Sequence, residues 1–151
     1  MLIKKIKYTD YDGNERTETF YFNLSRSEIA ELQLTYPGGY AQYIERTVDS
    51  KDRPKLMEMF KDIIMRSYGE KSEDGRRLVK SQELSTAFKQ TEAYDELFME
   101  LITDPNAAIG FITGVLPDLG DNVNKDQIIK EAVEKSGIKV DKVIDSNKSE
   151  E

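Results

Sequence analysis

A charged segment with two glycines, SYGEKSEDGRRLVKS at residues 67–81, is the first stretch to test for chemistry. A phosphate-binding loop requires G-x-x-x-x-G-K-S/T, because backbone amides surround the phosphates while the lysine neutralises them. Here Gly69 is followed by Glu70, and Ile64 stands where the upstream glycine would be. An acid would therefore face the phosphates. We interpret the segment as a solvated connector between two helices.

A second candidate is DYDGNE at residues 10–15, whose spaced aspartates resemble the start of a calcium loop. Such a loop begins D-x-D-x-D-G and ends in a glutamate at its twelfth position. Asp10 and Asp12 fit the first two ligand positions, but Gly13 comes too early and Tyr21 stands at the twelfth position. The Asp-Gly pair instead favours a hairpin turn, and we predict no metal site.

Catalytic side chains are scarce in this composition. The sequence has no histidine and no cysteine, which removes the commonest general base, thiolate chemistry and cysteine-based zinc sites. Ser67, Ser72 and Ser81 stand in loop or cap contexts, where no base is evident. Acid pairs such as Glu92 and Glu96 arise by chance among 29 acidic residues and are typical of a charged helix face. We predict no catalytic residue and no cofactor; a small hydrolase that uses carboxylates stays open as a rival.

Composition also limits the partners. The chain has 151 residues, the usual size of one domain, and a net charge of -7, which repels the phosphates of nucleic acid. The N-terminus has lysines but no long apolar run, so we expect no signal peptide. The run PNAAIGFITGVLP at 105–117 is too short to span a bilayer. We expect neither nucleic acid nor membrane as a partner.

The elements that must position any site begin with a β-hairpin over residues 2–24. Apolar residues alternate with polar ones in LIKKIKY and in TETFYFNL, and the Asp-Gly turn lies between them. Ser25 then caps a helix, with Glu28 three residues later completing a capping box. This helix should end before Pro37, which is followed by two glycines.

Helical periodicity dominates the rest of the chain. We predict helices over residues 40–48, 52–68, 81–89, 91–103 and 104–116. Their start signals are Asp52 with Pro54 for the second helix, a Ser81 cap for the third, a Thr91 cap for the fourth and Asp104 for the fifth. The fold class is therefore α+β, a mostly α-helical single domain over 1–117 with the N-terminal β-hairpin. Aromatic residues are absent after Phe111, so we separate 118–151 as a C-terminal appendage: a helix near 124–137 and a flexible charged tail.

The stretch from Pro105 to Leu116 carries no charged residue, although a helix on a domain surface should show a polar side. Gly110 and Gly114 form a G-x-x-x-G spacing, which allows close approach of a neighbouring element. Either this helix is central in its own core, or a partner covers part of it. If a partner does, the anchors at helical spacing are predicted to be Phe98, Leu101, Phe111, Ile112, Val115 and Leu116.

These segments also carry a family resemblance. SYGEKSEDGRRLVKS, followed by QTEAYDELFMELITDPNAAIGFITGVLP, resembles the tail assembly chaperones of long-tailed, siphovirus-like bacteriophages, and the DGNERTETFYFNLS opening is similar to that family too. The match covers roughly residues 8–117, with its strongest portions at 68–80 and 90–101.

The resemblance implies a non-catalytic role. Such proteins bind the tape measure protein in the host cytoplasm, keep its long apolar helices soluble and help recruit tail tube subunits. They then leave, so the protein is expected to be absent from the mature virion. Exposed strand edges and apolar helices also favour self-association into a homo-oligomer. The alternative is a structural head–tail or tail component that the virion retains.

Overall fold

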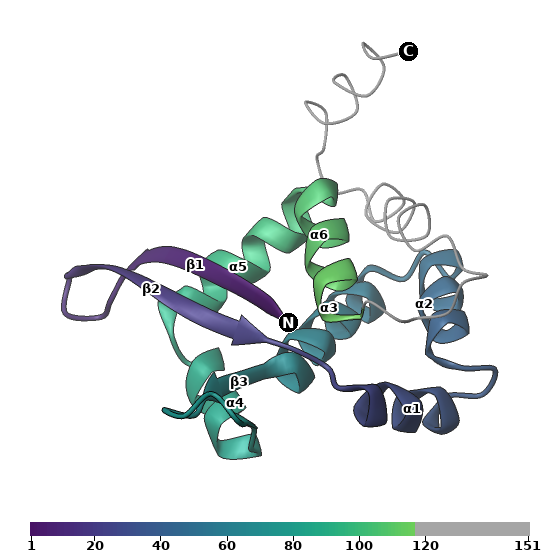
Figure 1. Cartoon of the computed structure of the whole chain (residues 1–151). Coiled ribbons are helices and arrows are strands. Elements are labelled where there is room, and N and C mark those ends of the chain that lie inside the picture. The colour runs from purple at the N-terminus through teal and green to yellow at the C-terminus, as the bar shows by residue number, and fades with distance from the viewer. Residues whose placement is uncertain (117–151) are drawn as a thin grey trace, which may run out of the picture.

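Ten secondary-structure elements follow one another in the computed structural model, which describes residues 1–116 (Figure 1). The strands are β1 (Leu2–Thr9), β2 (Glu15–Phe22), β3 (Tyr68–Lys71) and β4 (Leu78–Val79). The helices are α1 (Arg26–Thr35), α2 (Tyr40–Asp49), α3 (Arg53–Ser67), α4 (Gln82–Lys89), α5 (Glu92–Thr103) and α6 (Pro105–Val115). The α+β, mostly helical prediction is confirmed.

The four strands form one antiparallel sheet in the order β1-β2-β3-β4. β1 and β2 pair along their whole length, from Leu2↔Phe22 to Thr9↔Glu15, so the predicted hairpin is confirmed. Gly13, at the turn, has a positive φ of 85°, a conformation that favours glycine.

The connector predicted at 67–81 is wrong in part. Its first residues pair with β2 through Tyr21↔Gly69 and Phe22↔Tyr68, and its last residues form β4. The segment is thus a second hairpin that continues the sheet, because Tyr68 and Gly69 are buried while the charges stay in the solvated turn.

Side-chain caps start the helices where the sequence predicts them. The Ser25 hydroxyl accepts a hydrogen bond from the Glu28 N–H, and the Glu28 carboxylate accepts one from the Ser25 N–H, which completes the capping box. Asp52, Ser81, Thr91 and Asp104 cap α3, α4, α5 and α6 by accepting backbone N–H groups with their side chains, without the reciprocal bond. These caps satisfy amide groups that a helix leaves unpaired at its start.

Helices pack on one face of the sheet. α5 and α6 contact β1, α3 contacts β2, and α4 contacts β3; Figure 1 shows β1 running alongside α5. Along β1 the residues alternate accordingly, with Ile6 buried and Ile3, Lys5 and Lys7 exposed. The other face of this hairpin is therefore open to solvent.

An aromatic cluster holds the sheet to the helices. The Phe22 ring is fully buried and lies 5.2 Å from the Phe111 ring and 5.8 Å from the Phe88 ring, measured between centroids. Phe88 also stacks on Tyr68 at 4.3 Å. The core thus joins β2, β3, α4 and α6, and such ring pairs add stability beyond the area they bury.

Residues 118–151, for which the sequence predicts a helix and a charged tail, lie outside the described residues. The proposed boundary at residue 117 therefore stays a prediction. None of the helices within 1–116 combines the length and the apolar composition needed to cross a bilayer.

Candidate functional site

The turn between β3 and β4 uses its polar groups internally. The Ser72 hydroxyl bonds the Asp74 carboxylate at 2.8 Å, and that carboxylate also accepts the Arg76 N–H at 3.0 Å. Both bonds lower the pKa of Asp74 below its usual value, and the bond from the Arg76 N–H has the larger effect. Because the Arg77 N–H donates to Ser72 Oγ, the turn directs its amides at its own side chains instead of at an anion.

The Asp10 turn is self-satisfied as well. The Asp10 carboxylate accepts N–H groups from Asp12 and Asn14 at 2.9 Å and the Arg16 guanidinium at 2.5 Å. The Arg16 hydrogen bond is the largest of the effects that lower the Asp10 pKa. The hairpin interpretation of this segment is confirmed, and residues 1–116 hold no cluster of acids that could bind a metal ion.

The predicted partner-binding residues lie mostly inside the molecule. Leu101, Phe111, Ile112, Val115 and Leu116 are at most 3% exposed. Phe98 is half-buried, and its ring stacks on Tyr94 at 5.8 Å. In the described structure the uncharged helix α6 is therefore a core helix, the first of the two alternatives. Capture of a partner by these residues stays a prediction, and it would require α6 to move away from its neighbours.

Only one glycine of the G-x-x-x-G spacing is used for close packing. A Cβ atom built on Gly114 would lie 3.1 Å from Leu2 Cδ1, whereas a Cβ on Gly110 would meet nothing within 4 Å. The close approach is therefore between α6 and strand β1, and the other glycine faces open space.

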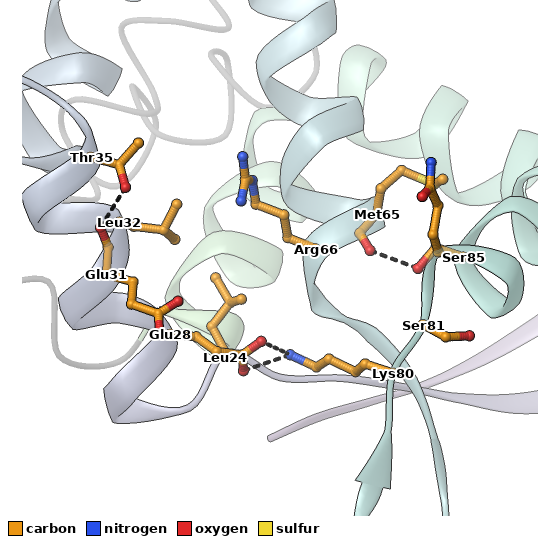
Figure 2. Close-up of a pocket in the computed structure, with 11 residues that line it drawn as sticks. Leu24, Glu28, Glu31, Leu32, Thr35, Met65, Arg66, Lys80, Ser81 and Ser85 are labelled. Carbon is orange, nitrogen blue, oxygen red and sulfur yellow. Dashed lines mark hydrogen bonds and ion pairs between the residues drawn. The ribbon is translucent and has the colours of Figure 1, made fainter.

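A groove that the sequence did not indicate lies between α1, the end of α3 and the start of α4 (Figure 2). Its volume is about 630 Å³. The lining surface is about equally polar and apolar and consists of Leu24, Glu28, Glu31, Leu32, Thr35, Met65, Arg66, Lys80, Ser81, Gln82 and Ser85.

An ion pair closes one end of this groove. Lys80 Nζ lies 2.8 and 2.9 Å from the two carboxylate oxygens of Glu28 and also donates to the Asn23 carbonyl. Burial alone would raise the pKa of Glu28, but the bonds from Lys80 and from the Ser25 N–H outweigh it and lower that pKa. Glu28 thus ties the start of α1 to the segment that follows β4.

The hydroxyl groups of the groove are engaged in structure. Ser85 Oγ donates to the Met65 carbonyl at 2.9 Å, and Ser81 Oγ accepts the Leu84 N–H at 3.0 Å. Lys80 donates to three oxygen atoms, two of Glu28 and the Asn23 carbonyl, and the hydrogen bonds found for Ser81 Oγ do not include it. The two hydroxyl groups thus stabilise the local structure, and the groove is suited to binding polar groups.

A cation, Arg66, lies at the opposite end of the groove. Arg66 Nε pairs with Asp62 at 2.7 Å, and its side chain is still 45% exposed. Burial acts to lower the pKa of Arg66, but the hydrogen bond and charge of Asp62 raise it overall. Figure 2 shows Arg66 between α1 and α4, on the same side as Thr35. A bound segment would meet both a guanidinium and the exposed carboxylate of Glu31.

By class, residues 1–116 form a small α+β protein with a charged groove on its surface. A family model described as phage tail assembly chaperone matches residues 1–151, the whole length of the chain. The chain therefore belongs to the phage tail assembly chaperone family, which confirms the resemblance and extends it beyond residues 8–117. No curated protein and no solved structure matches the chain.

Proposed function

We propose that this protein binds the tape measure protein of a phage tail, keeps it soluble in the host cytoplasm and helps bring tail tube subunits to it. The observation that carries the proposal is the family match over all 151 residues. We also propose that it acts without catalysis, since Glu28 and Lys80 pair with each other and the hydroxyl groups of Ser81 and Ser85 bond the backbone.

The groove between α1 and α4 is the surface that we assign to the partner segment. It is preformed, unlike the apolar residues of α6, which the core covers. Its Arg66 and Glu31 supply charges of both signs, so it suits a helix with mixed polar character better than a wholly apolar one. Leu34, on the same helix α1, is 89% exposed and offers an apolar contact beside it.

Co-expression tests the proposal. The protein is produced together with the long helical protein encoded near it, and the soluble fraction of that partner is measured by gel densitometry. The partner should be insoluble alone and soluble in the pair. If every long helical tail protein tested stays insoluble when it is co-expressed with this chain, the proposal is contradicted.

Two tryptophan substitutions on α4 test the groove itself. Gln82→Trp fills the groove, whereas Ala87→Trp adds the same side chain to an exposed residue outside the groove lining. The first should reduce the soluble partner several-fold and the second should leave it unchanged. Equal yields of soluble partner with both variants would mean that the partner binds outside the groove.

Virion composition separates this role from the alternative one. A chaperone that leaves should be missing from purified virions by mass spectrometry, whereas a head–tail or tail component should be present at a stoichiometric level. Finding the protein there at such a level would replace the proposal by the structural alternative.

A further inference from the structure

Strand β1 has an open edge. In the sheet order its only neighbour is β2, so among residues 1–116 no strand pairs with its other side. The Asp10 N–H donates to the Asn14 carbonyl, so Asp10 and Asn14 form a hydrogen-bonded pair that continues the β1/β2 register. In an antiparallel ladder only every second residue of a strand belongs to such a pair, so the even-numbered residues of β1 bond β2. Ile3, Lys5 and Lys7 therefore direct their peptide groups away from β2.

A hollow runs beside this edge. It has a volume of about 360 Å³ and lies between β1 and helix α5. The strand side of its lining is Lys5, Ile6 and Lys7, and the helix side is Glu96, Leu97, Met99, Glu100 and Thr103. Met99 is 53% exposed, so part of its apolar side chain is available for contact. An added strand would find unpaired backbone groups and an apolar contact in the same place.

Charge decides which strand fits. Lys5 and Lys7 are exposed and pair with no acid within 1–116, whereas Lys4 is paired with Glu100 at 2.6 Å. The strand side of the hollow is thus basic although the chain carries a net charge of -7; on the helix side Glu100 is paired with Lys4, and Glu96 is the remaining acid. Opposite charges placed across a strand pair stabilise it, and like charges destabilise it.

The same charges disfavour a second copy as the occupant. Antiparallel self-pairing centred on Lys5 places that lysine opposite its own copy, and pairing centred on Ile6 places Lys5 opposite Lys7. Lysines on an edge strand are a common protection against such pairing. The occupant that the edge accepts is an acidic strand.

We propose that the open edge of β1 binds an extended acidic segment of a partner protein as an additional strand of the sheet. Its acidic side chains lie opposite Lys5 and Lys7, and the alternate small or apolar side chains lie over Met99. Glu96 also faces the hollow, so acids on both faces of the segment would be repelled. This surface is separate from the groove between α1 and α4.

Synthetic peptides test the proposal by fluorescence anisotropy with the full chain. The probe alternates glutamate with valine; one matched peptide has lysine for each glutamate, and another keeps the glutamates but carries N-methyl groups on alternate amides. The glutamate peptide should bind at least tenfold more tightly than either. Equal binding of the N-methylated peptide would overturn the proposal, because attraction would then need no strand pairing.

Charge reversal provides the matched protein control. Lys5→Glu combined with Lys7→Glu should reverse the preference between the glutamate and lysine peptides. Lys61→Glu combined with Lys89→Glu changes the net charge equally at exposed residues of α3 and α4 and should leave the preference unchanged. Equal loss of binding in both double variants would overturn the proposal. So would a wild-type dimer in sedimentation whose formation prevents the glutamate peptide from binding, since the occupant of the edge would then be a second copy.

Discussion

At the scale of single residues, Tyr40 is a side chain whose burial is incompletely compensated. Its ring is fully buried against Tyr36 and Tyr43, and its hydroxyl has no hydrogen-bond partner among residues 1–116. Burial is the main cause that raises the pKa of this phenol, followed by the charge of Asp62. A hydroxyl that loses water without gaining a partner costs free energy on folding.

We therefore expect Tyr40→Phe to raise the free energy of unfolding by about 1 kcal/mol, because only the unpaired oxygen is removed. Urea denaturation followed by circular dichroism measures the change. Tyr36→Phe, at a half-buried ring, is the control and should change stability by less than about 0.5 kcal/mol. A less stable Tyr40→Phe variant would mean that the hydroxyl finds a partner in solution.

Glu28 makes stability depend on pH. Its carboxylate joins the capping box to Lys80, and its pKa is lowered in the folded protein. A carboxyl with a lowered folded-state pKa stabilises the protein above its ordinary pKa of 4.5, and this contribution is lost as the pH falls through the folded-state pKa.

Glu28→Gln should accordingly lower the free energy of unfolding at neutral pH by about 1 kcal/mol, the usual size of a capping interaction. The difference from wild type should shrink in acid, and denaturation curves at several pH values would show it. Glu31→Gln changes an exposed carboxyl of the same helix and serves as the control. A difference that stays constant down to the most acidic pH at which both proteins fold would show that packing, and not charge, explains the loss.

At the scale of elements, local signals predicted most boundaries. Ser25, Ser81 and Thr91 are side chains that cap helices by contacts within three residues, so their effect is visible in the sequence itself. The second hairpin was missed for the opposite reason. Tyr68 and Gly69 become a strand because β2 lies beside them, and that neighbour is more than forty residues away in the sequence.

The two glycines of α6 should respond differently to substitution. Gly110→Ala should raise the free energy of unfolding by about 1 kcal/mol, because alanine favours the helix and nothing lies near the new Cβ. Gly114→Val should lower it by about 1–3 kcal/mol, because the added atoms would collide with Leu2. Thermal unfolding of both variants beside wild type provides the comparison. The same sign of change at both positions would contradict the assigned packing of Gly114 against β1.

At the scale of the whole molecule, the groove could not be predicted from periodicity. Its walls come from residues 24–35, 65–66 and 80–85, and the Lys80 bond to the Asn23 carbonyl joins positions 57 residues apart. No spacing rule connects such residues before the chain is folded. The uncharged stretch at 105–116 was recognised as unusual, but sequence alone left open whether the core or a partner covers it.

The last prediction concerns this uncharged helix and depends on the whole fold. Phe111 contacts Phe22 across the core, and Val115 is fully buried. Replacing one large buried side chain costs about 3–5 kcal/mol, while small domains have about 5–15 kcal/mol in total. Phe111→Ser combined with Val115→Ser should therefore abolish the folded circular dichroism spectrum.

Thr113→Ser is the matched control on the same helix, because serine keeps the hydroxyl that bonds the Ile109 carbonyl at 2.8 Å. It should fold and should still solubilise the co-expressed partner. If instead the double variant stays folded and the partner is lost from the soluble fraction, then α6 is itself the partner surface. The free chain would then be in a closed state in which α6 is buried, and the partner would stabilise an open state in which α6 is exposed. A ligand shifts such an equilibrium toward the state that it binds more tightly.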